Sequence, residues 1–330
     1  MAADVAVDLG TANTRIVVRG RGLALEAPSV VATRGGDAVA VGEEAREMLG
    51  RAPAGLTVTQ PIRGGVVADF AATEQLLHFL LRKVSSRTLL RPRILVCVPA
   101  ETTEVERRAV QESARAAGGR EVYLVAAPMA AAIGAGLPVT EPVANMIVDI
   151  GAGQTEVAVI SLGGVVVQHS VRVAGDAMDE AIAQWLRSRQ NLIIGEQTAE
   201  SVKLRIGCAT VPDRPDRMRV RGRELATGKP REIEIDSDDI ARALAEPVAR
   251  IRDAVLEVLG RTPPELSADI IDRGVILCGG TSQLRHLDRV LREVTGLPVL
   301  GAERPLHCAA LGAGHLLEDP DLFGRVAAAP

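Results

Sequence analysis

The sequence predicts an α/β fold built from two similar domains that face each other, and three observations indicate it. Short apolar strands alternate with helical patterns along the 330 residues. A strand–turn–strand unit occurs twice, at Asp8–Thr11 (DLGT) and at Asp149–Ala152 (DIGA), 141 residues apart. Aromatic residues make up only 2% of the chain, so the core must consist of Val, Leu, Ile and Ala, as in a sheet covered by helices.

The repeated unit reads as a hairpin in both places. In the first copy, the apolar run Val5–Val7 and the run Arg15–Val18 flank a short polar turn. In the second copy, Met146–Asp149 leads through a glycine-rich turn to Glu156–Ile160. Two matched copies of one hairpin predict two related domains more strongly than either copy alone.

A further strand and helix are predicted from an apolar run and from residues that typically begin or end these elements. Ile94–Val98 is a continuous apolar run that ends at Pro99, as expected for a buried strand. The next helix should begin where Thr103 and Glu106 stand at capping-box spacing, and it should end at Gly118-Gly119.

A second strand–glycine–helix unit is predicted near the C-terminal end. Val275–Cys278 is the strand, Gly279-Gly280 is the turn, and Ser282 is the expected cap of the following helix. Between the units, residues 237–259 predict a long amphipathic helix, which Pro247 should kink.

Composition excludes several classes of protein. The net charge of −4 gives no reason to expect nucleic acid as a partner. Four scattered cysteines form no CxxC pair, which argues against a zinc site and fits a reducing cytosol. The N-terminus leads directly into a strand, so we expect no signal peptide. Val122–Thr140 is uncharged, but its Ala, Gly and Pro content favours a buried helix with loops over a membrane span.

Other phosphate-binding motifs do not fit. Gly222–Lys229 superficially resembles a P-loop, but it has five residues between its glycines, and Pro230 stands where Ser or Thr should follow. No GxGxxG follows a strand. The arginine-rich residues 211–231 fit a solvated hairpin better than an anion-binding patch.

The two hairpin turns can bind phosphate. Glycines let the backbone N–H groups approach phosphate oxygens without a Cβ clash. An aspartate ends the strand before each turn, and a carboxylate so close to phosphate needs a cation between them. Asp8 and Asp149 therefore predict Mg²⁺ held largely through water. Four side chains near the turns can add donors: Thr11, Asn13, Gln154 and Thr155.

These residues carry a resemblance to the superfamily of actin, the DnaK-type chaperones and the sugar kinases. Within it, the chain is similar to the MreB-type rod-shape-determining bacterial actins along nearly its whole length. The matching stretches are Asp8–Thr14 (DLGTANT), Pro28–Ala32 (PSVVA), Gly65–Phe70 (GVVADF), Pro128–Pro138 (PMAAAIGAGLP), Thr155–Gly164 (TEVAVISLGG), Ser170–Ile182 (SVRVAGDAMDEAI) and Thr295–Val299 (TGLPV).

The resemblance implies an actin-like fold, which is a duplicated RNase H-like fold. The first domain would cover residues 1–140, with a small subdomain at about 28–62. The second would cover residues 141–330, with a small subdomain at about 177–240. The C-terminal helix would return to the first domain.

The resemblance also implies that ATP or GTP binds with Mg²⁺. The two turns would contact the phosphates, an E-x-x-K helix would line the ribose and base, and the late turn would close the pocket from the other side. The residues at those positions are Gly10, Thr11, Ala12, Asn13, Gly151, Ala152, Gly153, Gln154, Glu200, Ser201, Val202, Lys203, Gly279, Gly280, Thr281 and Ser282. By itself, the Glu200–Lys203 spacing fits a surface ion pair better than a ligand site.

The sequence departs from the family at the place where catalysis is expected. MreB-like proteins typically carry two glutamates before the proline of PMAAAIG, and one is thought to position the attacking water. Here those positions are Ala126 and Ala127, which can neither accept a proton nor orient water. Asp149 and Gln154 remain as candidate catalytic residues. We therefore expect nucleotide binding with slow or absent hydrolysis.

Family members also contact the membrane through a short hydrophobic loop. The candidate here is the Arg87–Arg93 stretch, in which Leu89 and Leu90 stand among three arginines. Arginines near anionic lipid contribute about 1 kcal/mol each. The alternative is an ordinary loop before a strand.

The resemblance implies a cytoplasmic filament protein, peripheral at the inner face of the membrane, that assembles with itself and organises cell-wall elongation proteins. A chaperone would need a peptide-binding domain that no segment encodes. A small-molecule kinase would need a catalytic base that cannot be singled out. A nucleotide-binding MreB-like paralogue that acts as a partner or regulator without polymerising alone remains the alternative.

Overall fold

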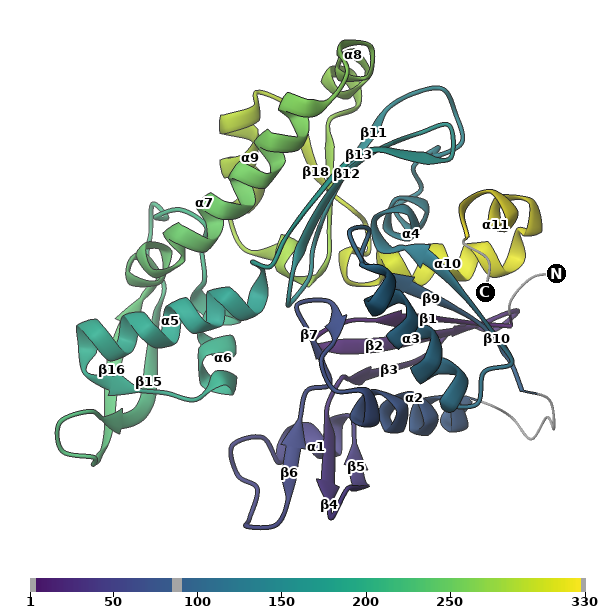
Figure 1. Cartoon of the computed structure of the whole chain (residues 1–330). Coiled ribbons are helices and arrows are strands. Elements are labelled where there is room, and N and C mark those ends of the chain that lie inside the picture. The colour runs from purple at the N-terminus through teal and green to yellow at the C-terminus, as the bar shows by residue number, and fades with distance from the viewer. Residues whose placement is uncertain (1–3, 85–90, 328–330) are drawn as a thin grey trace.

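The computed structural model describes residues 4–84 and 91–327 and contains two domains, each built on a five-stranded sheet (Figure 1). In the first sheet, three strands form an antiparallel meander, and two more strands extend it in parallel. The order across this sheet is β3 (Gly22–Pro28), β2 (Asn13–Val18), β1 (Val5–Leu9), β9 (Arg93–Val98) and β10 (Glu121–Ala126).

The second sheet repeats this topology. Its first three strands are again an antiparallel meander, and its last two are again parallel. The order is β13 (Gly164–Val171), β12 (Thr155–Ser161), β11 (Asn145–Ile150), β17 (Val275–Cys278) and β18 (Val299–Gly301). The duplication expected from the two hairpins is confirmed.

The register shows how closely the two sheets correspond. Asp8 faces Arg15 on the neighbouring antiparallel strand. In the second sheet, Asp149 faces Glu156 in the same way. Each aspartate is therefore the last acidic residue of the first strand before the turn, and the residue opposite it stands seven positions later in both copies.

Helices cover the outer face of each sheet. On the first sheet these are α2 (Phe70–Val84) and α3 (Glu104–Ala116), packed over a core of Val, Leu and Ile. The predicted capping box begins α3: Thr103 and Glu106 bond each other's backbone N–H groups. On the second sheet, the outer helices are α5 (Gly175–Gln190), α7 (Ser237–Arg261), α8 (Pro264–Arg273) and α9 (Leu287–Thr295).

Two helices lie between the sheets and join the domains. α10 (Cys308–Glu318) packs against β1, β2, β3 and β9 of the first sheet, and α11 (Pro320–Val326) follows it. α4 (Ala127–Gly134) follows β10 and packs against β11 and β12 of the second sheet. The two helices cross at Gly134 and Gly312, where their backbones touch.

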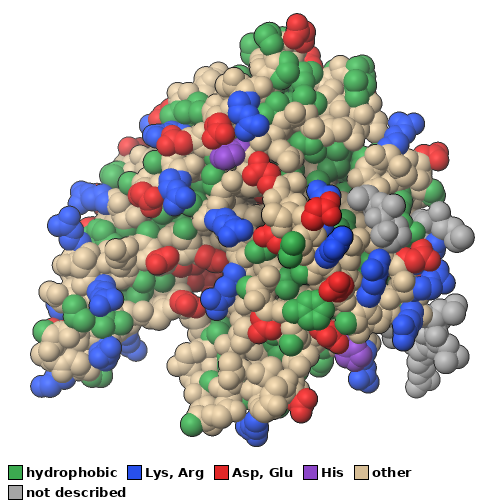
Figure 2. Space-filling view, viewed as in Figure 1, with side chains coloured by type: hydrophobic (Ala, Val, Ile, Leu, Met, Phe, Trp, Pro, Cys, Tyr) green, Lys and Arg blue, Asp and Glu red, His purple; other side chains and the backbone are tan. Residues whose placement is uncertain are grey.

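A small lobe extends from each domain. The first contains β4 (Val31–Arg34), β5 (Asp37–Val41), β6 (Thr57–Thr59) and α1 (Glu43–Glu47). The second contains α6 (Glu196–Ile206), β14 (Leu192–Ile193), β15 (Arg217–Glu224) and β16 (Pro230–Asp236). The lobes project at the bottom and left of Figure 1, and Figure 2 shows a notch between them.

Several local predictions can now be compared with the structure. Residues 217–236 form the predicted hairpin, whose arginines are exposed and pair with glutamates. Ser282 was expected to cap a helix, and this is wrong: residues 280–283 form a 3₁₀ turn, η1 (Gly280–Gln283), in which the Ser282 hydroxyl donates to the Gly279 carbonyl at 2.7 Å. α9 begins only at Leu287, after His286 in a left-handed conformation.

The uncharged stretch at residues 122–140 is strand β10 followed by the buried helix α4, as expected. None of the helices within the described ranges combines the length and apolar character that crossing a bilayer requires. The membrane-contact candidates Leu89 and Leu90 lie outside the described residues.

Replacing Gly312 with alanine tests the helix crossing. An added Cβ would collide with the Ala130 carbonyl, so α4 and α10 would have to separate. We expect the free energy of unfolding to fall by about 2–3 kcal/mol in equilibrium urea unfolding. Gly260→Ala is the matched control, because this helical glycine has open space around it and should gain about 0.5–1 kcal/mol. Equal stability of Gly312→Ala and wild type would show that the crossing does not need backbone contact.

Candidate functional site

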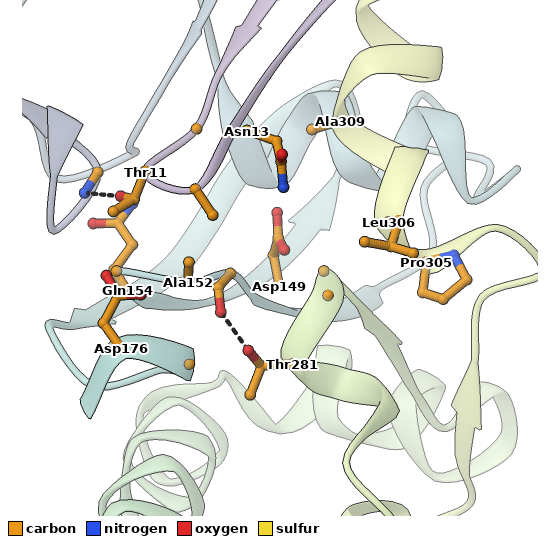
Figure 3. Close-up of a pocket in the computed structure, with 18 of the residues that line it drawn as sticks. Thr11, Asn13, Asp149, Ala152, Gln154, Asp176, Thr281, Pro305, Leu306 and Ala309 are labelled. Atoms are coloured by element: carbon orange, nitrogen blue, oxygen red, sulfur yellow. Dashed lines mark hydrogen bonds between the residues drawn. The ribbon is translucent and has the colours of Figure 1, made fainter. Parts of the chain in front are cut away.

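A cavity of about 550 Å³ lies between the two domains, and the loops that follow the central strands of both sheets line it (Figure 3). The β1–β2 turn contributes Gly10–Asn13, and the β11–β12 turn contributes Gly151–Gln154. The start of α5, the inner side of α6, and the turns η1 and η2 (Pro305–His307) complete the wall. The repeated hairpins therefore converge on one site from opposite domains.

Hydrogen bonds link each hairpin turn to a neighbouring loop of its own domain. The Thr11 hydroxyl accepts a bond from the Gly65 N–H at 3.0 Å, and the Thr281 hydroxyl donates to the Gly151 carbonyl at 2.6 Å (Figure 3). Gly153 has no room for a side chain, because a Cβ there would lie 2.5 Å from the Thr11 hydroxyl. Close backbone approach is thus required where the two domains meet.

Most of the residues predicted to bind nucleotide line this cavity. They are Gly10, Thr11, Ala12, Asn13, Gly151, Ala152, Gly153, Gln154, Glu200, Lys203, Gly279, Gly280 and Thr281. Three predicted residues are not part of the lining. Val202 faces the core of the second domain with no exposed surface, which follows from its place between Glu200 and Lys203 on a helix. Ser201 and Ser282 also lie away from the cavity wall.

The two predicted magnesium aspartates both lie in the cavity. Burial raises the pKa of Asp8 above its ordinary value. Burial, together with the charge of Asp8, raises the pKa of Asp149 to about 7. In Figure 3, the side chains of Asp149 and Asn13 point toward each other. Two carboxyl groups removed from bulk water near one another provide a place where a hard cation is favourable.

The side chains in the cavity could hold Mg²⁺ only if water molecules and phosphate oxygens complete its coordination shell. Within the described residues, no group of three or more His, Cys, Asp or Glu side chains could hold a metal ion. Asp8 and Asp149 could therefore supply only part of a coordination shell. Mg²⁺ commonly binds in this way, through one or two carboxylates, several waters and substrate phosphates.

Lys203 forms an ion pair across the site that sequence analysis did not predict. Its ammonium lies 2.7 Å from Asp179 Oδ2 and donates to the Gly175 carbonyl at 2.9 Å. Burial raises the pKa of Asp179 to about 7, and Lys203 opposes that shift. Because Asp179 is on α5 and Lys203 on α6, the pair fixes two walls of the cavity relative to each other.

Glu156 is a second group that sequence analysis missed. It is 4% exposed, lines the cavity, and accepts a bond from the Ala100 N–H of the first domain at 2.7 Å. Burial raises the pKa of this carboxyl to about 8, against the hydrogen bonds that it receives. A signal was available in the sequence, since Glu156 stands seven residues after Asp149, opposite it in the hairpin.

The position at which the sequence resemblance implies a catalytic glutamate is apolar here. Ala127 is the first residue of α4 and lines the cavity, whereas Ala126 precedes the helix and is not part of the cavity wall. Both alanines pack against the core between the sheets. Gln154 also lines the cavity, and its amide lies close to Gly65: a Cβ on that glycine would be 2.5 Å from Gln154 Cδ.

The fold and the site define an actin-like protein: two duplicated sheets with a cavity between their hairpin turns. Comparison with solved structures agrees. MreB5 of Spiroplasma citri bound to ADP superposes with a TM-score of 0.91 at 33% identity, over 97% of each chain. The MamK double helical filament, at 22% identity and a TM-score of 0.80 over 96% of this chain and 98% of that one, supports the fold.

The chain belongs to the MreB/Mbl protein family, whose family model matches residues 2–325. It is 51% identical to the cell shape-determining protein MreB of Escherichia coli (strain K12), over 97% of this chain and 95% of the relative. It is 45% identical to the cell shape-determining protein Mbl of Bacillus subtilis (strain 168), over 97% of each. The resemblance read from the sequence is confirmed.

The Glu156→Gln variant tests whether the pKa of the buried Glu156 carboxyl is raised, through the pH dependence of the free energy of unfolding. The pKa of Glu156 is about 8 in the folded protein, against an ordinary value of 4.5, so the folded state binds more protons between these values. The free energy of unfolding of the wild type should therefore fall across that range, by up to about 1.4 kcal/mol per pH unit from this group. Glutamine keeps an acceptor for Ala100 but does not titrate.

In urea unfolding between about pH 5 and 9, the variant should gain stability relative to wild type until about pH 8 and keep a constant difference above it. Glu112→Gln, on the exposed surface of α3, is the control. Parallel pH curves for wild type and Glu156→Gln would show that Glu156 is already ionised at acidic pH.

Proposed function

We propose that this chain binds ATP or GTP in the interdomain cavity and assembles with copies of itself into filaments. One observation carries the proposal: glycine-containing turns from both domains converge on one cavity, in a member of the MreB/Mbl family. Family relatives support it, because MreB5 of Spiroplasma citri has been solved with ADP and with AMPPNP.

The cavity offers suitable groups at both ends. Backbone N–H groups of the β1–β2 and β11–β12 turns would bind the phosphates. Glu200 and Lys203 on α6 would face the ribose and base, with apolar contacts from Leu284 and Leu306. Mg²⁺, when bound, would neutralise phosphate charge beside Asp8 and Asp149. A ligand held in this way touches both domains, so its binding favours their closed arrangement.

We propose that hydrolysis is slow. A water-positioning group is a recurring part of phosphoryl-transfer sites, and Ala127 supplies none at the start of α4. The Gln154 amide is the nearest substitute, but it lies against Gly65. Asp149 is better placed to act on the cation than on water. The nucleotide would then act mainly as a structural ligand.

Binding, phosphate release and pelleting should be measured on the same preparation. We expect ATP binding, sedimentable filaments and little steady-state phosphate release. Ala127→Glu should raise phosphate release by about tenfold or more, since it restores a carboxylate at the cavity wall. Ala126→Glu is the matched control, because Ala126 does not line the cavity. Rapid turnover by the wild type would refute slow hydrolysis, and binding without pelleting would identify a paralogue that needs a partner to polymerise.

We further propose that the protein acts in the cytoplasm at the inner face of the membrane, where it organises cell-wall elongation proteins and cell shape. The names of the relatives, which are cell shape-determining proteins, support this role. Leu89 and Leu90 are the proposed lipid contacts. Of the arginines beside them, Arg91 is exposed, whereas Arg93 pairs with Asp4 at 3.0 Å and so has a structural role.

Liposome co-sedimentation tests the membrane contact. Replacing both Leu89 and Leu90 with serine should abolish most binding of assembled protein to anionic vesicles, because two buried leucines contribute a few kcal/mol per subunit and a filament repeats them. Leu225→Ser is the control, since this exposed leucine lies in the β15–β16 hairpin. Unchanged co-sedimentation of the double variant would place the membrane contact elsewhere.

A further inference from the structure

Arg15 is a buried arginine at the phosphate end of the cavity. Its residue is 8% exposed, it lines the cavity, and its Nη1 lies 3.3 Å from Asp8 Oδ2. Cross-strand pairing places the two residues directly opposite each other. One of the two carboxylates beside the turns thus already has a cationic partner supplied by the chain.

The guanidinium is held in place from its other side. Its Nε and Nη2 lie 2.9 Å and 2.7 Å from Glu26 Oε1, and Glu26 Oε2 lies 3.1 Å from the His307 ring. His307 is the last residue of η2, so this network joins β2 and β3 to the segment that begins α10. An arginine fixed by two carboxylates is preorganised and cannot swing freely into solvent.

Donor capacity remains on the guanidinium. An arginine has five N–H donors, and the bonds to Asp8 and Glu26 use three of them. Glu26 is not part of the cavity wall, and its side chain is 39% exposed, so solvent screens its charge more than that of Arg15. Inside the cavity, Asp8 and Arg15 therefore form an ion pair, and the remaining N–H donors of Arg15 are the groups of this network that can bind an anion.

The second hairpin carries an acidic residue at the position where the first hairpin carries Arg15. The position that corresponds to Arg15 is Glu156, which is buried and faces Asp149. The field of Arg15 also reaches the second domain, since its charge lowers the pKa of Asp149 against the effect of burial. The surroundings of the two aspartates therefore differ. Of the two hairpins, only the first places a cationic side chain, Arg15, opposite its aspartate.

We propose that Arg15 supplies, from the protein itself, part of the positive charge that the nucleotide phosphates require, so that nucleotide binding depends only weakly on Mg²⁺. This inference rests on the proposed nucleotide binding in the cavity. Arg15 neutralises Asp8, which would otherwise repel a diphosphate or triphosphate at close range. It also leaves N–H donors for a phosphate oxygen or a bridging water.

The test is the affinity for ADP with Mg²⁺ and with EDTA, measured by calorimetry. In the wild type, removal of Mg²⁺ should weaken binding by less than about tenfold, because the Arg15 charge remains. In Arg15→Leu, which keeps the apolar stem volume, the same removal should weaken binding by about a hundredfold or more. Arg15→Lys should resemble the wild type, since it keeps the charge.

Arg19→Leu is the matched control, because Arg19 follows the same strand but points away from the cavity to Glu318 at 3.7 Å. If Arg15→Leu fails to fold, as judged by thermal unfolding, Arg15→Gln takes its place, with polarity kept and charge removed. Equal Mg²⁺ dependence in wild type and in the charge-removed variant overturns the inference while nucleotide binding stands. Absence of ADP binding by the wild type under both conditions refutes the proposed nucleotide binding, and the role of Arg15 falls with it.

Discussion

The crossing of α4 and α10 is the contact on which the rest of the molecule depends. Each helix packs against a sheet, and they touch each other through backbone at Gly134 and Gly312. Small residues at this crossing set how closely the two sheets approach. Because the hairpin turns extend from the central strands of these sheets, the same spacing brings the β1–β2 and β11–β12 turns to one cavity. A wider crossing would separate the turns of the two domains that are proposed to bind phosphate.

The cavity contains buried acidic groups whose removal from water lowers the stability of the fold. Asp149 and Glu156 lie beside each other on β11 and β12, and burial raises the pKa of both into the neutral range. Carboxyl groups that are kept from bulk water lower stability unless a partner compensates them. Glu156 has such a partner in the Ala100 N–H of the other domain, so its hydrogen bond also links the domains. Asp149 lies close to the Gly279 backbone, and a cation, when one is bound, would compensate its charge.

Sequence reasoning found the elements whose signal is local and missed the contacts that arise across strands. The hairpins at Asp8 and Asp149 were predictable because apolar runs, an acid and glycines recur in the same order. The 3₁₀ turn at Ser282 was mistaken for a helix start, since a serine before an apolar run carries the same local signal in both structures. Arg15 and Glu156 were missed because their roles depend on register. In each hairpin, strand pairing places the residue seven positions after the aspartate directly opposite it. This spacing is visible in the sequence.

The proposed nucleotide binding and the proposed turnover would depend on different parts of this molecule. Binding would use both hairpin turns and the Asp8–Arg15–Glu26 network, which lie on or between the strands of the two sheets. Turnover would depend on the start of α4, where Ala127 reaches the cavity without a functional group. That end of α4 is also constrained, because Pro128 stands in its first turn and the helix packs closely along α10. An alanine in place of an acid there would remove the water-positioning group and leave the helix crossing and the hairpin turns intact. Under the proposed function, nucleotide-dependent closure of the domains is therefore compatible with slow hydrolysis, because closure requires only that the ligand contact both turns.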